Sequence, residues 1–201
     1  MTSPPVILAS ASASRAKVLK AAGVLFAAIP AHADEAAVKQ NMQAQNATAL
    51  QCAAALAELK AMAISRSYPG ALVIGADQML ECQGAWFDKP PSRLAARAQL
   101  ITLAGKTHLL PTATVIVRDG ARIWEHLDTP RLTMRPFDEA FVDSYLEQAG
   151  AAVLQSVGAY QLEDLGAQLF QTVEGDFFTI LGLPLLPLLA FLRKQGVVGI
   201  G

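Results

Sequence analysis

Serines and one arginine are concentrated in the segment Ser10-Ala-Ser12-Ala-Ser14-Arg15, between a short apolar run and a segment with helical spacing. Backbone N–H groups at a helix N-terminus, together with a guanidinium group, form an anion site, and phosphate is its usual occupant. The segment has neither P-loop spacing nor a dinucleotide-binding glycine motif. A serine-rich turn that caps a helix, with Arg15 in solvent, is the alternative interpretation.

Three further charged residues stand in apolar or rigid surroundings. Lys60 lies on a small, apolar helical face, so it either extends to solvent or faces a cleft that holds an anion. Asp77 follows the apolar run 72–76, where a carboxylate can bind a metal, accept a proton or simply begin a turn. Lys89 precedes Pro90 in a loop and either binds a phosphate or is exposed. Two lysines, an arginine and a carboxylate are the groups that a metal-bound polyphosphate requires.

The spacing of apolar residues predicts the elements that must position these groups. In the first part of the chain we expect strands at Val6–Ala9, Leu25–Ile29 and Leu72–Ala76, helices at Arg15–Ala22 and Asn46–Ser67, and a loop over Pro30–Gln45. Further on we expect helices at Ser92–Ala104 and Asp138–Ala149 and from Pro184, a hairpin of His108–Val117 with Ala121–Glu125, a strand at Leu132–Phe137, and a strand-rich segment over Val157–Leu181.

The alternation of helices and strands predicts an α/β fold, and the hairpin predicts a mixed sheet. Within the helix that Ser92 caps, we expect Leu94, Ala98 and Ile101 to face the core.

Composition restricts the class of ligand. The 201 residues are 53% hydrophobic, which suits one domain or two lobes around a shared cleft. Because 16 basic residues oppose 17 acidic ones, the chain has no basic field for nucleic acid, and a few placed cations must bind any anionic small molecule.

Other features predict a soluble, cytoplasmic protein without a membrane partner. The N-terminus lacks a basic segment before its apolar run, and the apolar segment 180–192 is too short to span a bilayer. Cys52 and Cys82 fit no zinc or redox spacing, and they suit buried, reduced thiols.

The order of short segments along the chain resembles the Maf family of septum-formation proteins. The matching segments are Ile7-Leu-Ala-Ser-Ala-Ser12, Ala33-Asp-Glu35, Val73-Ile-Gly-Ala-Asp77, Asp88-Lys-Pro90, Leu103-Ala-Gly-Lys-Thr-His108, Val157-Gly-Ala-Tyr160, Glu174-Gly-Asp-Phe-Phe-Thr179 and Gly182-Leu-Pro-Leu185. Because these segments extend from Val6 almost to the end in the family's order, the resemblance is far more specific than any single motif.

The resemblance implies an elongated mixed α/β fold related to the inosine-triphosphate pyrophosphatases. Residues 1–201 would form a single domain with two lobes around a cleft, commonly as a homodimer. The implied reaction is hydrolysis of nucleoside triphosphates to nucleoside monophosphate and pyrophosphate with a divalent metal, Mg²⁺ or Mn²⁺.

The resemblance also implies roles for particular residues. Asp77 matches the proposed general base, and Asp77 and Glu35 would bind the metal. The phosphate-binding residues would be Arg15, Lys60 and Lys89, with Ser10 contributing a hydrogen bond.

Three positions bear on the choice of substrate. Gln78 and Glu163 replace residues typical of pyrimidine-selective members and resemble the branch that cleaves 7-methyl-GTP. Ser14 replaces the first of two usual arginines and does not match the tryptophan of that branch. We therefore expect 7-methyl-GTP or another modified nucleotide as substrate. The alternatives are a pyrimidine-selective (dTTP or UTP) pyrophosphatase and a non-catalytic, nucleotide-binding regulator of cell division.

Overall fold

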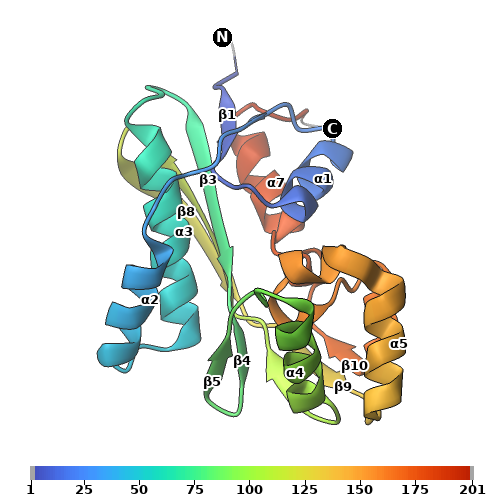
Figure 1. Ribbon diagram of the computed structural model, residues 1–201. Coiled ribbons are helices and arrows are strands. Elements are labelled where there is room, and N and C mark those ends of the chain that lie inside the picture. Colours follow the sequence, from blue (N-terminus) through green and yellow to red (C-terminus); the bar gives the residue numbers. More distant parts are fainter. Residues whose placement is uncertain (1–2, 200–201) are drawn as a thin grey trace. The chain divides into compact units, whose positions relative to one another are not determined.

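The computed structural model describes residues 3–199, and the chain divides into two compact units (Figure 1). The first unit contains the N-terminal part of the chain as far as Gln78, then Thr112–Asp128, and the segment from Asp176 onward. The second unit contains Met79–Pro111 and Thr129–Gly175. Each unit has its own five-stranded sheet, and the fold is of the predicted mixed α/β class.

The first unit is built on a sheet with the strand order β2-β1-β3-β7-β8. Its strands are β1 (Val6–Leu8), β2 (Ala27–Ala28), β3 (Leu72–Gln78), β7 (Thr112–Arg118) and β8 (Ala121–Asp128). Strand β1 pairs in parallel with β2 and β3, whereas β3–β7 and β7–β8 are antiparallel. This sheet is therefore mixed, as predicted, and β7–β8 forms the predicted hairpin. Its first strand is shorter than predicted, because Thr107–Leu109 is a separate strand of the other unit's sheet and the chain enters the first unit only after Pro111.

Helices cover both faces of this sheet (Figure 1). They are α1 (Ala13–Ala21), α2 (Glu35–Ala44), α3 (Ala49–Ser65), α6 (Phe177–Ile180) and α7 (Leu185–Lys194). Alternate residues of β3, namely Leu72, Ile74 and Ala76, belong to the core cluster that includes the apolar side chains of α1 and α7. The intervening residues of β3 face α3, because successive side chains of a strand point to opposite sides.

The loop predicted over Pro30–Gln45 is wrong, because most of this segment forms α2. None of the residues of α2 is buried, so the sequence has no apolar period that would have revealed the helix. The available signal was polar: Asp34 caps the helix by accepting a hydrogen bond from Ala37 N at 2.9 Å. Glu35 follows in the first turn, where an acidic side chain is favourable.

The second unit contains an antiparallel sheet with the order β10-β9-β6-β4-β5. Its strands are β4 (Leu80–Cys82), β5 (Ala85–Phe87), β6 (Thr107–Leu109), β9 (Arg131–Met134) and β10 (Phe170–Glu174), and its helices are α4 (Arg93–Leu103) and α5 (Glu139–Ala149). Three 3-10 helices follow, η1 (Gly150–Gln155), η2 (Val157–Ala159) and η3 (Leu165–Leu169).

The strand-rich character predicted for Val157–Leu181 is wrong, since only β10 is a strand within it. Gly158 has φ +78°, which bends the chain away from an extended conformation.

The predicted inward face of α4 is also wrong, although Ser92 does cap the helix. Leu94 is 77% exposed, Ala98 and Ile101 are exposed too, and the buried side chains are Ala96, Leu100 and Leu103. Helix α4 is therefore rotated about its axis relative to the prediction. Arg97 explains this rotation, because its guanidinium binds acidic side chains of α5, Asp143 at 2.6 Å and Glu139 at 2.8 Å. Within residues 3–199, no helix has both the length and the apolar character needed to cross a membrane.

Candidate active site

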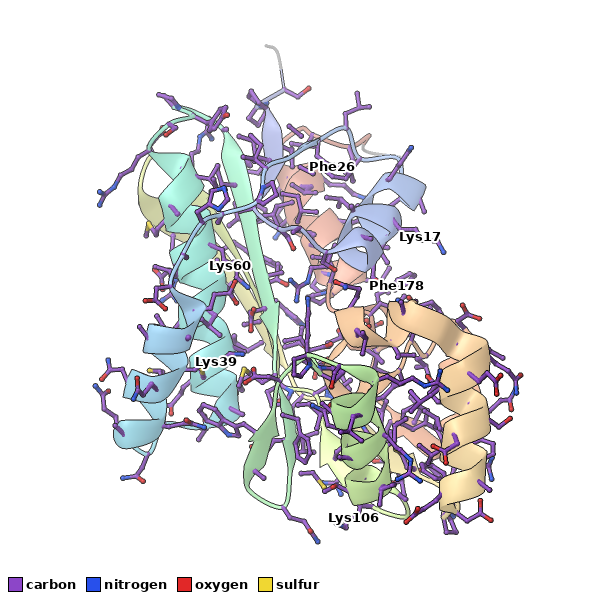
Figure 2. The ribbon with its side chains drawn as sticks, viewed as in Figure 1. Lys17, Phe26, Lys39, Lys60, Lys106 and Phe178 are labelled. Carbon is purple, nitrogen blue, oxygen red and sulfur yellow. The ribbon has the colours of Figure 1, made fainter. Side chains whose placement is uncertain are left out.

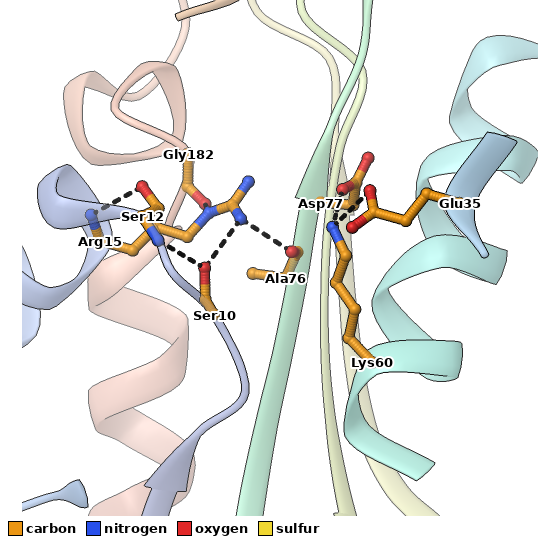
Figure 3. Close-up of polar contacts among 8 residues, drawn as sticks. All are labelled: Ser10, Ser12, Arg15, Glu35, Lys60, Ala76, Asp77 and Gly182. Carbon is orange, nitrogen blue, oxygen red and sulfur yellow. Dashed lines mark hydrogen bonds and ion pairs between the residues drawn. The ribbon is translucent and has the colours of Figure 1, made fainter. Parts of the chain in front are cut away.

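Three of the predicted site residues meet around one ammonium group in the first unit. Lys60 extends from α3 toward β3 (Figure 2), where Nζ donates to Asp77 Oδ1 at 2.6 Å. Glu35 Oε2, from the first turn of α2, lies 2.9 Å from the same nitrogen (Figure 3). Lys60 and Asp77 are buried, whereas the Glu35 side chain is 42% exposed. We call these three residues the Lys60 cluster.

A glycine inside β3 brings the cluster together. Gly75 and Asp77 are two residues apart, so they face the same side of the sheet. A Cβ at Gly75 would overlap the carbonyl oxygen of Ala57 on α3 and would lie 2.9 Å from Ala61 Cβ. The missing side chain lets α3 approach β3 closely, and Lys60, one turn beyond Ala57, then reaches Asp77.

Asp77 is predicted to follow the strand, but it lies within β3. Gly75 is a site-forming residue that the predicted set of site residues does not include. The signal was a glycine within an apolar run, which commonly marks a close backbone approach.

The carboxylates of the Lys60 cluster suit a divalent cation. Two carboxylates share one ammonium, which leaves negative charge in excess, and they already converge on a cation. Mg²⁺ prefers such oxygens and is commonly held by one or two carboxylates together with substrate phosphates and water. Among the described residues, no group of three or more His, Cys, Asp or Glu side chains could hold a metal. Asp77 and Glu35 are therefore the residues that could hold such an ion, together with oxygens of the substrate.

Arg15 lies buried in the same unit, so the alternative in which it is exposed to solvent is wrong. Nε donates to Gly182 O at 2.8 Å, and Nη1 donates to Ala76 O at 2.9 Å and to Ser10 Oγ at 3.3 Å (Figure 3). Burial lowers the pKa of Arg15 from its ordinary value, while the carboxylates of Asp77 and Glu35 act in the opposite direction. A guanidinium nevertheless remains protonated in proteins, so Arg15 is a buried cation.

The position of Arg15 follows from where β1 ends. Ala9 N donates to Ile74 O at 2.8 Å, and β1 then leaves the edge of β3. The next carbonyl of β3 that points to the side where β1 paired belongs to Ala76, and Arg15 Nη1 donates a hydrogen bond to it. A buried carbonyl needs such a partner, so the guanidinium replaces the missing strand.

The serines of the β1–α1 turn have distinct roles. Ser12 caps α1 by accepting from Arg15 N at 3.4 Å. Ser10 Oγ accepts from Ser12 N at 3.1 Å and from Arg15 Nη1. A hydroxyl oxygen accepts two hydrogen bonds, so what Ser10 can still offer an anion is its O–H. Ser14 is half-buried in the first turn of α1.

Gln78 is held by atoms of its own unit. Its Nε2 donates to Thr112 Oγ1 at 2.9 Å, to Thr179 O at 3.0 Å and to Ile180 O at 3.2 Å. These contacts connect the end of β3 to β7 and α6.

Lys89 and Glu163 lie in the second unit, both exposed. Lys89 is in the segment between β5 and α4, and Glu163 is in the turn between η2 and η3. The structure thus gathers Ser10, Arg15, Glu35, Lys60, Asp77 and Gln78 in one unit, whereas Lys89 and Glu163 belong to the other. The roles assigned to all of these residues remain predictions.

Comparison with known proteins yields one family and many close relatives. The model of the Maf-like protein family matches residues 5–195. A nucleoside triphosphate pyrophosphatase of Paramagnetospirillum magneticum is 58% identical over 190 residues, which cover 94% of this chain and 98% of that protein. One from Granulibacter bethesdensis is 53% identical over 94% of this chain and 96% of its own length. A 7-methyl-GTP pyrophosphatase of Brucella abortus is 46% identical over the same fractions of the two chains.

Proposed function

The chain belongs to the Maf-like protein family, and on this premise we propose that it is a metal-dependent nucleoside triphosphate pyrophosphatase. Two relatives of that name are 58% and 53% identical over nearly their whole length. The observation that carries the proposal is the Lys60 cluster, in which two carboxylates and an ammonium meet in the same unit as the buried cation Arg15.

In the proposed reaction, water attacks the α-phosphorus, the bond to the β-phosphate oxygen breaks, and pyrophosphate leaves. Asp77 takes a proton from the attacking water. Lys60 donates to Asp77 Oδ1 in this structure, and in the reaction its ammonium turns toward the phosphates, which leaves both carboxylate oxygens open to the water. The same movement brings positive charge to the departing pyrophosphate, where it stabilises the developing negative charge.

Asp77 and Glu35 would hold the divalent metal together with oxygens of the triphosphate. When bound, such an ion neutralises phosphate charge and polarises the attacking water. Arg15 would contribute charge mainly through Nη2, because Nε and Nη1 bind Gly182, Ala76 and Ser10. Ser10 would donate its O–H to a phosphate oxygen.

For the substrate we propose 7-methyl-GTP or a related modified purine. The Brucella abortus relative carries that substrate in its name. Glu163, an exposed carboxylate, can accept hydrogen bonds from N1–H and the exocyclic amine of guanine. Methylation at N7 makes that ring positive, which adds attraction to a carboxylate. A glutamine in place of Glu163 would have no net charge and would suit a pyrimidine edge.

A product assay tests the reaction and separates the alternatives. With Mg²⁺ or Mn²⁺, equal amounts of monophosphate and pyrophosphate are expected from 7-methyl-GTP, with slower turnover of GTP, UTP and dTTP. Release of diphosphate and orthophosphate would mean attack at another phosphorus and would contradict the proposal. Faster turnover of UTP or dTTP would favour the pyrimidine-selective enzyme, and binding without turnover would favour the regulator of cell division.

A further inference from the structure

A buried histidine–tyrosine pair lies in the second unit. His108, on β6, has no exposed surface, and its Nε2 lies 2.8 Å from the hydroxyl oxygen of Tyr160, which is 5% exposed. The ring of Phe170 packs against both, with centroid distances of 5.9 Å to His108 and 4.8 Å to Tyr160. The hydrogen bond is therefore buried, with the apolar ring of Phe170 beside both partners.

The protonation of the pair is fixed by burial. Desolvation lowers the pKa of His108 to about 4 and raises the pKa of Tyr160, so both groups are neutral near pH 7. Within the described residues, His108 Nδ1 is buried without a hydrogen-bond partner. Such an atom is costly, and an apolar ring would pack here without that cost. The bond to Tyr160 is therefore what a histidine gains over an apolar residue at this position.

The backbone before Tyr160 is held in an unusual conformation. Ala159 has φ +60°, in the left-handed region that a residue with a side chain rarely adopts. Its carbonyl accepts from the Tyr145 hydroxyl at 3.2 Å. At Gly158, a Cβ would lie 2.6 Å from both Leu80 Cδ1 and Tyr160 Cε1. Strain of this kind persists only where the surroundings impose it, and it is common at functional sites.

The backbone after Tyr160 forms a tight turn that carries Glu163. Asp164 N donates to Gln161 O at 3.2 Å, and Ala167 N donates to Asp164 O at 3.0 Å. A Cβ at Gly166 would overlap the Gln161 carbonyl oxygen, so the turn packs against the start of η3. Because Gln161 directly follows Tyr160, the anchored ring fixes the first residue of the turn.

We propose that His108 and Tyr160 are positioning residues that direct the Glu163 carboxylate and thereby determine which nucleobase is selected. This inference rests on the role in base selection that the proposed function gives to Glu163. Tyr160 anchors the 161–164 turn at one end, and His108 fixes the Tyr160 hydroxyl. The left-handed backbone of Ala159 fixes the direction in which the chain enters Tyr160.

The test compares Tyr160→Phe, which keeps the ring and removes the hydroxyl, with the unmodified enzyme. The ratio of kcat/KM for 7-methyl-GTP to that for UTP should fall about 10-fold, the effect of one hydrogen bond, mainly through KM with kcat little changed. Amide hydrogen exchange at Asp164 and Ala167 should become faster, whereas amides of the β9–β10 ladder should be unaffected.

Two further variants separate positioning from general destabilisation. His108→Gln keeps a hydrogen-bonding amide near the Nε2 position, able to donate or accept, and should preserve the ratio, whereas His108→Phe should lower it. Because His108 acts through Tyr160, adding His108→Phe to Tyr160→Phe should cause no additional loss. Val142→Ala, which opens a cavity under α5, is the control: it should lower thermal stability without changing the ratio.

The outcomes distinguish this inference from the proposed function. If Glu163→Gln lowers the ratio but Tyr160→Phe changes neither the ratio nor the exchange of Asp164 and Ala167, the positioning role is wrong and the role of Glu163 stands. If Glu163→Gln leaves the ratio unchanged, the proposed base selection fails and this inference fails with it.

Discussion

At the scale of single residues, Asp77 is the side chain whose charge the proposed reaction requires most. Asp77→Asn keeps the shape of the side chain but cannot take a proton, so kcat should fall roughly 10²–10⁴-fold. Lys60 keeps Glu35 at 2.9 Å, and the amide oxygen can still accept its hydrogen bond. The free energy of unfolding should therefore fall by only about 1–3 kcal/mol, measured with urea.

The control for this prediction is Asp119→Asn. Asp119 Oδ1 accepts from Gly70 N at 2.7 Å in an exposed turn of the same unit. The variant should keep full turnover. Near-normal turnover by Asp77→Asn would instead remove Asp77 from the chemistry.

His108 makes the stability of the protein depend on pH. Its pKa is about 4 in the folded protein against 6.5 ordinarily, so between these values the unfolded chain binds more protons. Above pH 6.5 the titration of His108 leaves the free energy of unfolding unchanged. As pH falls from 6.5 toward 4, the free energy of unfolding decreases, with a limit of about 3 kcal/mol. Urea unfolding of the unmodified protein and of His108→Gln should show a larger loss below pH 6.5 in the former. Identical pH profiles would mean that His108 is not neutralised by burial.

At the scale of elements, the contact of α3 with β3 determines the geometry of the Lys60 cluster. A Cβ at Gly75 would overlap the Ala57 carbonyl oxygen, and neither backbone can yield locally. Gly75→Ala should lower the free energy of unfolding by about 3 kcal/mol or more and should move Lys60 away from Asp77, which abolishes turnover. Gly199→Ala, where an added Cβ meets nothing within 4 Å, is the matched control. Normal stability of Gly75→Ala would contradict the close approach.

The cap of α2 tests whether a peripheral helix serves the site. Asp34→Ala removes the hydrogen bond to Ala37 N, which typically costs about 1 kcal/mol of helix stability. Because α2 buries no residue, the loss should be local: faster amide exchange at Ala37 and Val38, with an almost unchanged melting temperature. Glu35 should then hold the metal less well, so the Mn²⁺ concentration at half-maximal activity should rise. Asp34→Asn retains a capping oxygen and should behave like the unmodified protein.

The sequence predicted elements well where one face is apolar and poorly where none is. Strand β3 appears as a continuous apolar run and α3 as a long segment with apolar residues at helical spacing, so their existence follows from the sequence. Helix α2 has no apolar period, and its polar cap at Asp34 carries the signal instead. The inward face of α4 depends on Arg97 and its partners on α5, which are contacts between distant segments that local spacing does not contain.

The candidate site was predictable as a set of residues but not as a geometry. The family resemblance implies site roles for Glu35, Lys60 and Asp77, whereas residue types alone leave Lys60 undecided between solvent and a cleft. That choice depends on Gly75, because its missing side chain brings α3 close enough for the ammonium to reach Asp77.

At the scale of the whole molecule, the chain divides into two units, and the residues with predicted roles belong to both of them. The first unit holds Lys60 with its carboxylates, whereas Glu163 belongs to the second. Substitutions in the Lys60 cluster should therefore affect every substrate alike, whereas those around Glu163 should discriminate between nucleobases.

The Lys60 ammonium also links metal binding to the stability of the fold. It lies 2.6 Å from Asp77 and 2.9 Å from Glu35, so a divalent cation that binds these carboxylates must displace it. Lys60→Met removes the competing cation and leaves the buried Asp77 uncompensated. Without metal, the free energy of unfolding should fall by about 3 kcal/mol, since breaking one side of a buried ion pair is costly.

Mn²⁺ should reverse that loss more strongly in the variant than in the unmodified protein. A ligand that binds only the folded state stabilises it according to its concentration relative to Kd, by about 4 kcal/mol at 1,000-fold excess. Because Lys60→Met need not expel an ammonium, its Kd should be lower and its rise in Tm with Mn²⁺ larger, although turnover is lost with the lysine. Lys60→Gln, which keeps one donor, should lie between the two, and Lys17→Met, at an exposed lysine of α1, should match the unmodified protein. Equal Mn²⁺ shifts in Lys60→Met and the unmodified protein would mean that the metal binds away from Asp77 and Glu35.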